Sequence, residues 1–349
     1  MLDRSQDPAN DGYQLIRRAP LASRTTFDVP AVAAWLAELT RPQALPELLA
    51  RPEFRDLPRL VLGGGSNVLF TRDFDGLVVA LANRGIDVVE SAEEVDRVRV
   101  SAGENWDGFV RWSLGAGYVG LENLVLIPGS VGAAPFQNIG AYGVEVETFI
   151  ESVDAWDHDA ARFVTLQREE CAFAYRDSLF KQQRGRFVIT SVLFRLPRSR
   201  PLCLDYAGVR EELAAMGVTS PTATDAASAV ERLRLRKLPN PADIGNAGSF
   251  FKNPVVPATQ ARSLQASHPQ LPVFHLEDGS CKLSAAWLIQ QCGFKGYREG
   301  DAGVSDKHAL VLVNHGNATG AELMSLAERI RNAVRESFGV GLEPEPVVL

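Results

Sequence analysis

The sequence predicts a mixed α+β protein rather than a Rossmann or P-loop fold, on two observations. The first is a series of short apolar runs that favour strands; they cover residues 60–62, 68–70, 77–80, 98–101 and 187–194. The second is the glycine-rich loop 63–67, which joins one predicted strand to the next. A dinucleotide-binding fingerprint would open a helix at this point, and a P-loop would carry Gly-Lys-Ser/Thr, so neither fold is predicted.

Predicted helices complete the α+β pattern. Apolar residues follow helical spacing within residues 105–114. Further helices are predicted over residues 224–237, which precede two prolines, and over residues 283–292, which precede a glycine. A capping box that begins at Thr319 predicts another helix. The apolar residues 309–313 favour a buried strand.

Length and composition indicate a globular protein of two or three domains. Of the 349 residues, 46% are hydrophobic and 23% are charged, which is ordinary for such a chain. The formal net charge of −7 argues against broad nucleic-acid binding, which needs a basic face. Neither the histidines nor the four cysteines have metal-ligand spacing, so we expect no metal and free thiols at Cys171, Cys203, Cys281 and Cys292.

The start of the chain is polar and lacks the apolar segment of a signal peptide, so we expect a cytoplasmic protein. We expect residues 1–20 to form a loose N-terminal extension. No membrane span is predicted. The uncharged stretch 123–144 contains glycines and prolines, which break the helix that a span requires.

This uncharged stretch is expected instead to be irregular, with exposed backbone amides. Its central part, residues 127–143, holds four glycines and two prolines. The loop 63–67 offers the same chemistry, because successive backbone amides can cradle an anion. Two such surfaces in one chain predict a cofactor that carries a pyrophosphate. For the loop taken by itself, a tight connection between strands is the alternative interpretation.

Several short motifs occur in a fixed order along the chain. They are Thr25-Thr-Phe27, Gly63-Gly-Gly-Ser-Asn67, Gly103-Glu-Asn-Trp106, Gly120-Leu-Glu-Asn-Leu124, the segment 127–143, Tyr175-Arg-Asp-Ser178, Gly245-Asn-Ala-Gly-Ser-Phe-Phe-Lys-Asn-Pro254, Lys307-His-Ala309 and Leu342-Glu-Pro-Glu345. The ordered set spans residues 21–345 and resembles the UDP-N-acetylenolpyruvoylglucosamine reductase (MurB) family. These flavoenzymes complete UDP-N-acetylmuramate in bacterial peptidoglycan synthesis. Any single motif is weakly diagnostic, whereas the ordered set is specific.

The resemblance implies an FAD-binding domain of the vanillyl-alcohol-oxidase (PCMH) type, in two subdomains, over residues 21–197. A connecting segment with a tyrosine loop follows over residues 198–240, and a C-terminal α+β substrate-binding domain over residues 241–349. The resemblance also implies non-covalent FAD, NADPH as the reductant and UDP-N-acetylglucosamine-enolpyruvate as the substrate. No obligate protein partner is evident from the sequence.

The same resemblance implies which residues hold FAD. The loop 63–67 would bind the pyrophosphate, and the segment 127–143 would wrap the flavin and adenine portions. The implied contacts are Gly63, Gly64, Gly65, Ser66, Asn67, Pro128, Gly129, Ser130, Gly132, Gln137, Asn138, Gly140, Ala141 and Gly143.

Three residues would carry the chemistry, as the resemblance implies. Arg176 would hold the substrate carboxylate and the charge that develops on the enol; a structural ion pair with Asp177 is the alternative. Ser249 would deliver a proton to carbon, although its neighbours alone indicate a turn residue. Glu345 would share the stabilisation of the intermediate, and the motif selects it over Glu343. The few residues after Glu345 predict little support for it from that side.

The substrate-binding residues implied by the resemblance are Tyr206, Arg234, Lys237, Asn253 and Lys295. Arg234 and Lys237 share one face of a predicted helix and are candidates for the UDP diphosphate. A simple complement to the helix dipole is the alternative. Tyr206 indicates the family subtype in which a tyrosine loop closes over the substrate. His308 is expected to be structural.

Two other functions fit parts of the pattern. Oxidases of the same flavin fold frequently link FAD to a histidine or cysteine, and the glycine segments here contain neither. A nucleotide-sugar-binding protein that lacks catalysis would not need Arg176, Ser249 and Glu345 together. The predicted function is therefore the NADPH-dependent reduction.

Overall fold

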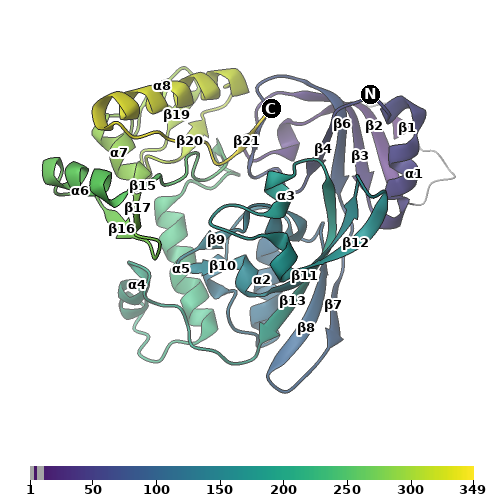
Figure 1. The fold of residues 1–349 in the computed structure, drawn as a ribbon, viewed down its shortest axis with the longest axis horizontal. Coiled ribbons are helices and arrows are strands. Elements are labelled where there is room, and N and C mark those ends of the chain that lie inside the picture. The colour runs from purple at the N-terminus through teal and green to yellow at the C-terminus, as the bar shows by residue number, and fades with distance from the viewer. Residues whose placement is uncertain (1–3, 6–11) are drawn as a thin grey trace. The chain divides into compact units, whose positions relative to one another are not determined.

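The structure is a computed structural model that describes residues 4–5 and 12–349. The chain divides into two compact units, whose elements are labelled in Figure 1. The first unit contains the chain up to Ala19, Ala33–Gly64 and Asp75–Arg234, and the second contains Pro20–Val32, Gly65–Phe74 and Leu235–Leu349. Each unit is therefore assembled from segments that are distant in sequence. The contiguous domain boundaries expected from the sequence stay a prediction.

A five-stranded sheet in the order β1-β2-β3-β6-β4 forms one part of the first unit. Its strands are β1 (Arg4–Ser5), β2 (Tyr13–Pro20), β3 (Val32–Leu39), β6 (Phe74–Leu81) and β4 (Arg59–Leu62). Strand β4 runs parallel to β6 at the sheet edge, and its C-terminal end leads into the glycine loop. Helix α1 (Leu45–Ala50) joins the core of this sheet, because Leu45 and Leu48 are buried with Leu39, Phe54 and Leu77.

Strand β2 contradicts the expectation that residues 1–20 form a loose extension. It buries Leu15, Ile16 and Ala19, and Leu15 belongs to the core of the sheet. Across the ladder, Ile16 pairs with Arg4. Three buried residues are enough for a strand that gains its hydrogen bonds from a neighbour, even in a polar stretch. The rest of the predicted extension, residues 1–3 and 6–11, lies outside the described residues.

A second five-stranded sheet, antiparallel throughout, forms the other part of the first unit in the order β12-β11-β13-β8-β7. Its strands are β12 (Arg162–Gln167), β11 (Ile150–Asp157), β13 (Phe187–Pro197), β8 (Val95–Ser101) and β7 (Ile86–Glu90). Helix α2 (Trp106–Gly115) packs on it, with the rings of Phe109 and Phe194 4.9 Å apart. The side chain of Asn105 caps α2 by accepting from the Gly108 amide. The predicted helix 105–114 is confirmed.

Three further helices belong to this unit or lead out of it. They are α3 (Leu179–Gln182), α4 (Val209–Ala215) and α5 (Ala223–Lys237). Helix α5 confirms the helix predicted over residues 224–237 and buries Ala226, Val230 and Leu233 in the same core as α2. Helix α4 was not predicted. It starts after Gly208, whose φ of 96° lies in the left-handed region, and it buries only one short face.

The second unit contains three small sheets and three helices. The sheets are β14-β20-β19-β18, β15-β17-β16 and the parallel pair β21-β5. Their strands are β14 (Gly245–Asn246), β20 (Leu312–Asn314), β19 (Ala302–Val304), β18 (Arg298–Glu299), β15 (Val255–Pro257), β17 (Ser280–Leu283), β16 (Val273–His275), β21 (Val347–Val348) and β5 (Val68–Leu69). The helices are α6 (Ala258–Ser267), α7 (Ala285–Gln291) and α8 (Gly320–Phe338).

Local signals predicted two of these helices well. The capping box at Thr319 is present, with the Glu322 amide donating to Thr319 Oγ1 and the Glu322 carboxylate accepting from the Thr319 amide. Helix α7 begins later than predicted, because Leu283 ends β17 and Ser284 caps the helix. The strand predicted over residues 309–313 is shorter and later, at β20, although the predicted residues are buried.

Two expectations concern the chain as a whole. All four cysteines are free thiols, of which Cys171 and Cys281 are buried. In the part of the chain that the structure describes, no helix has both the length and the apolar character needed to cross a membrane.

Candidate active site

In the first unit, the glycine loop packs directly against the uncharged segment. A Cβ atom added to Gly63 would lie 2.5 Å from Ser130 Oγ, and one added to Gly64 would lie 2.6 Å from Gly129 Cα. Only glycine permits this approach of backbone to backbone. The amides of Gly63 and Gly64 donate to no other group among the described residues, so both are available to an anion.

The second unit holds the rest of the loop. Gly65 has a φ of 60°, and the backbone of Arg24 lies where its Cβ would be. The Gly65 carbonyl accepts from the Thr26 amide at 3.2 Å. Asn67 is fixed by the end of the chain, because its Nδ2 donates to the Glu345 carbonyl at 3.3 Å and its carbonyl accepts from Val347 N at 2.9 Å.

The uncharged segment is irregular, as predicted. It contains two short 3-10 turns, at Val131–Ala133 and Pro135–Gln137, and the paired strands β9 (Gly140–Ala141) and β10 (Val144–Glu145). The hydroxyl of Ser130 is buried and has no hydrogen-bond partner in the described chain. Buried polar groups are normally hydrogen-bonded, so an unpartnered hydroxyl beside the two glycine segments is suited to bind a polar ligand. The residues present therefore fit a pyrophosphate cofactor such as FAD.

Two of the residues predicted to contact FAD form hydrogen bonds to other groups of the protein. The Gly132 amide donates to the Ala102 carbonyl at 2.9 Å. Asn138 is fully buried, its Nδ2 donates to Glu145, Glu147 and Ala174, and its Oδ1 accepts from the Glu147 amide. These two residues are suited to shaping the segment. The contacts expected from Pro128, Gln137, Ala141 and Gly143 stay predictions.

Arg176 lies in a tight turn formed by the bridge between Ala174 and Asp177. Its φ of 54° is left-handed, an uncommon conformation outside glycine that often marks functional turns. Its Nη2 donates to the Gly140 carbonyl at 2.7 Å, and its guanidinium lies 5.5 Å from the Tyr175 ring centre. The Asp177 carboxylate accepts from Gln182 Nε2. Arg176 is therefore positioned by the uncharged segment.

Arg234 and two tyrosines extend the site in the first unit. Arg234 Nη2 donates to the Leu126 carbonyl at 3.2 Å. Burial lowers the pKa of Arg234, and nearby Arg176 adds to the lowering; the group still remains charged. The Tyr142 ring lies 5.0 Å from the exposed ring of Tyr206, edge to face. Burial raises the pKa of Tyr142, and Arg234 opposes this.

Asn123 is a residue whose role the sequence reasoning missed. It is fully buried, and its Nδ2 donates to the carbonyls of Tyr142 and Cys203, at 2.7 and 2.8 Å. It thereby ties the uncharged segment to the loop that carries Tyr206. The motif Gly120-Leu-Glu-Asn-Leu124 was the available signal, since a buried amide needs partners.

In the second unit, Ser249 and Glu345 are brought together by backbone pairing. The Glu345 amide donates to the Phe250 carbonyl at 2.8 Å, and the Lys252 amide donates to the Glu343 carbonyl at 3.0 Å. Ser249 is half-buried next to Phe250, which is completely buried. The exposed Glu343 lies 3.4 Å from Lys252 Nζ. Glu345 is half-buried, and the choice of Glu345 over Glu343 stays a prediction.

The expectation that Glu345 has little support from its C-terminal side is wrong. Strand β21 pairs with β5, and the Thr71 amide donates to the Leu349 carbonyl at 2.7 Å. Pro346 is buried. Four residues suffice because they join a strand ladder, which the sequence does not reveal.

Two lysines of the second unit lie near His308. Lys237 and Lys295 are both exposed, and both contribute, after burial, to lowering the pKa of His308. His308 Nδ1 accepts from the Leu310 amide at 3.3 Å. The exposed ammonium groups of Lys237 and Lys295 thus both lie near the His308 ring. Asn253 Oδ1 accepts from the Ala285 amide at the start of α7.

The predicted catalytic and substrate residues therefore form two groups, one within each unit. The first unit holds Arg176, Tyr206 and Arg234, and the second holds Lys237, Ser249, Asn253, Lys295 and Glu345.

Two family models match the chain. One is the FAD binding domain, over residues 33–165, and the other is the C-terminal domain of UDP-N-acetylenolpyruvoylglucosamine reductase, over residues 240–349. UDP-N-acetylenolpyruvoylglucosamine reductase of Xanthomonas campestris pv. campestris is 54% identical over 338 residues, with 97% of each chain covered. The chain belongs to the UDP-N-acetylenolpyruvoylglucosamine reductase family. The Xylella fastidiosa member is 53% identical, with 94% of this chain and 93% of the relative covered.

A solved family member has the same fold. UDP-N-acetylenolpyruvylglucosamine reductase (MurB) from Thermus caldophilus superimposes with a TM-score of 0.67 at 26% identity, covering 96% of this chain and 98% of its own. With the matched FAD-binding domain, this makes the chain an FAD-dependent oxidoreductase of α+β fold with a reductase C-terminal domain.

Proposed function

We propose that the chain reduces UDP-N-acetylglucosamine-enolpyruvate to UDP-N-acetylmuramate for peptidoglycan synthesis, with NADPH as the reductant. The observation that carries the proposal is the full-length similarity to family members of this activity. Bound FAD would supply the hydride chemistry between NADPH and the methylene carbon of the enolpyruvyl group. The proposed compartment is the cytoplasm, which suits four free thiols.

Arg176 is proposed to hold the substrate carboxylate. Hydride addition to the methylene carbon places negative charge on the neighbouring carbon and on this carboxylate. A guanidinium binds such a group through two parallel hydrogen bonds. The contact with the Gly140 carbonyl fixes the guanidinium before substrate arrives, so little reorganisation is needed during the reaction.

Ser249 is proposed to donate the proton that completes the reduction, and Glu345 to stabilise the intermediate with Arg176. The backbone pairing of Phe250 with Glu345 supports this assignment, because it holds both side chains on adjacent segments of one unit. The buried rings of Phe250 and Phe251 line the same stretch and limit access of water.

The cations in each unit are proposed to bind the UDP portion of the substrate. Arg234 in the first unit and Lys237 and Lys295 in the second supply positive charge suited to a diphosphate. Tyr206 is exposed in its loop and is proposed to cover the bound substrate. Asn253 is proposed to contact the substrate through its amide nitrogen, since its oxygen caps α7.

Measuring the two half-reactions separately tests the proposal. Flavin reduction by NADPH needs no proton on substrate carbon, whereas reoxidation by the enolpyruvyl substrate does. In anaerobic stopped-flow experiments, Ser249→Ala should bleach normally with NADPH and then reoxidise at least about 100-fold more slowly, because general acid catalysis contributes roughly 10²–10⁴-fold. Ser249→Cys should recover part of the rate.

Ser267→Ala is the matched control, because Ser267 is an exposed serine at the end of α6. It should behave as the parent in both half-reactions. Reoxidation of Ser249→Ala at the parent rate would remove Ser249 from the proton transfer. A purified chain that takes up no FAD would contradict both the reductase and the oxidase, and substrate binding without turnover would favour the non-catalytic binding protein.

A further inference from the structure

A cationic cavity lies in the first unit at the N-terminal end of β4, whereas the glycine loop follows the C-terminal end of that strand. The cavity has a volume of about 960 Å³. Three loops line it, at residues 55–59, 158–159 and 183–186. Its charged lining consists of Arg55, Arg59, Arg184 and Arg186 with Asp56 and Asp159. The lining is therefore net positive in a chain whose formal net charge is −7.

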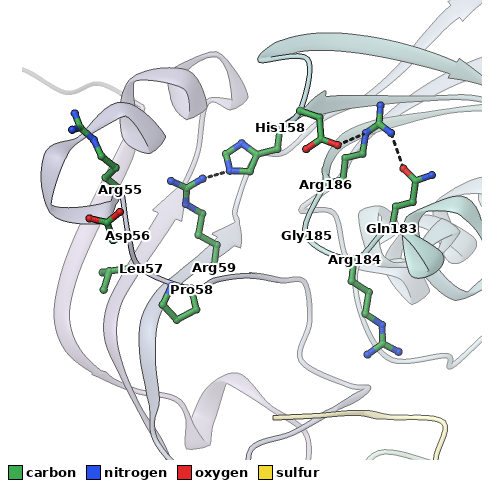
Figure 2. A pocket seen from close by; sticks show the side chains of 11 residues that line it. Arg55, Asp56, Leu57, Pro58, Arg59, His158, Gln183, Arg184, Gly185 and Arg186 are labelled. Atoms are coloured by element: carbon green, nitrogen blue, oxygen red, sulfur yellow. Dashed lines mark hydrogen bonds and ion pairs between the residues drawn. The ribbon is translucent and has the colours of Figure 1, made fainter.

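Arg59 is the central cation of this cavity. Its Nη2 donates to the Phe54 carbonyl at 3.3 Å, and its Nη1 contacts His158 Nε2. Figure 2 shows the Arg59 and His158 side chains reaching toward one another. The Nε of Arg59 is buried and has no partner among the described residues. A buried donor on a charged group is costly to leave unpaired, so this atom points to a missing acceptor.

The charged groups around Arg59 do not supply an acceptor for its Nε. Burial first, and then the charge of Arg59, lower the pKa of His158, which disfavours the protonated ring, while Asp159 and Asp157 oppose this. Arg186 already forms an ion pair with Asp157, with 2.7 Å between Nη2 and Oδ2. Arg55 and Arg184 are exposed and form no ion pair within residues 4–5 and 12–349. In Figure 2 they extend from loops on either side of Arg59.

We propose that this cavity is an anion-binding site for a small molecule that carries a phosphate or diphosphate group. Guanidinium groups match phosphate oxygens with paired hydrogen bonds. The volume falls in the range of roughly 300–1,000 Å³ that small-molecule sites occupy. The site is separate from the glycine loop, because the four residues of β4 span about 10 Å at about 3.3 Å per residue. The proposal does not rest on the proposed reductase activity.

Isothermal titration of the FAD-loaded chain with inorganic pyrophosphate, and separately with inorganic phosphate, tests the site. Arg59→Gln and Arg184→Gln should each weaken binding by about tenfold or more, as expected for loss of a hydrogen bond to a charged group. Arg184 is exposed, so its variant remains informative if Arg59→Gln fails to fold. Binding of both anions would define a single-phosphate site, and a preference for pyrophosphate would define a diphosphate site.

Arg262→Gln is the charge-matched control, because Arg262 is exposed on α6 in the second unit and should leave the affinity unchanged. Lys237→Ala distinguishes the cavity from the proposed UDP site. Binding that disappears in Lys237→Ala and persists in Arg59→Gln and Arg184→Gln would overturn the proposal. Absence of binding by either anion would overturn it as well.

Discussion

Replacing Gly64 with alanine should weaken FAD binding without unfolding the chain. The added Cβ would lie 2.6 Å from Gly129 Cα and 3.0 Å from Gly129 C. Non-bonded carbon atoms prefer about 3.5–4.0 Å, so the two glycine segments must move apart by about 1 Å. Both contacts are backbone atoms, which cannot rotate aside as a side chain would.

The size of the effect follows from this displacement. A shift of about 1 Å takes an amide hydrogen bond from about 2.9 Å to beyond its useful range. Each hydrogen bond to a charged phosphate contributes about 1.5–3 kcal/mol, so the loss of one lowers FAD affinity by about 10- to 100-fold. The strain on the fold itself should cost about 1–3 kcal/mol, as for other overpacked sites.

FAD titration of the apoprotein, followed by flavin fluorescence quenching, measures the affinity. Gly115→Ala is the matched control, because a Cβ added at the end of α2 meets nothing within 4 Å. It should keep the parent affinity and gain slight stability. If Gly64→Ala bound FAD as tightly as Gly115→Ala, the loop would be only a strand connection, and its amides would not hold the pyrophosphate.

Two further predictions concern the substrate site and acid stability. Tyr206→Ala and Lys237→Ala should each raise the KM for the enolpyruvyl substrate more than they lower kcat and leave flavin reduction unchanged, since both are proposed to supply uniform binding; an unchanged KM would remove them from the site. The hydrogen bond from Arg186 lowers the pKa of Asp157 to about 2. The ionised carboxylate therefore contributes its full stabilisation of the fold above the ordinary carboxyl pKa of about 4. This stabilisation is lost as the pH falls through about 2. Urea unfolding should therefore show Asp157→Asn less stable by about 1–2 kcal/mol at pH 5–7, with a difference that shrinks toward pH 2; a difference that grows on acidification would contradict the assignment.

Local sequence signals predicted the elements whose determinants are adjacent in the chain. The helical spacing behind Asn105 and the capping box at Thr319 both give helices with the expected caps. The irregular segment 127–143 was also predicted, because glycine and proline limit the backbone directly. The roles predicted for Arg176, Ser249 and Glu345 rest on the family resemblance of the ordered motifs and not on local pattern.

Long-range pairing accounts for what the sequence did not reveal. Strand β2 owes its order to pairing with its sheet neighbours, and the support for Glu345 comes from β5, far back in the chain. The cavity brings Arg59 together with loops about a hundred residues or more further along the chain, at His158 and at Arg186. The support for Glu345 and the cavity leave no periodic trace in the sequence, since they depend on single residues or on strands of two residues.

The pairing of β5 with β21 also sets an order of events during synthesis. Asn67 receives its partner Glu345 only after a further 278 positions have been translated. At about 5–20 residues per second, that interval is roughly 14–56 seconds. The nascent chain can form the first sheet and α2 during this time, whereas the contacts of Asn67 with Glu345 and Val347 cannot yet form. The contacts that hold Asn67 are therefore among the last of the fold to form.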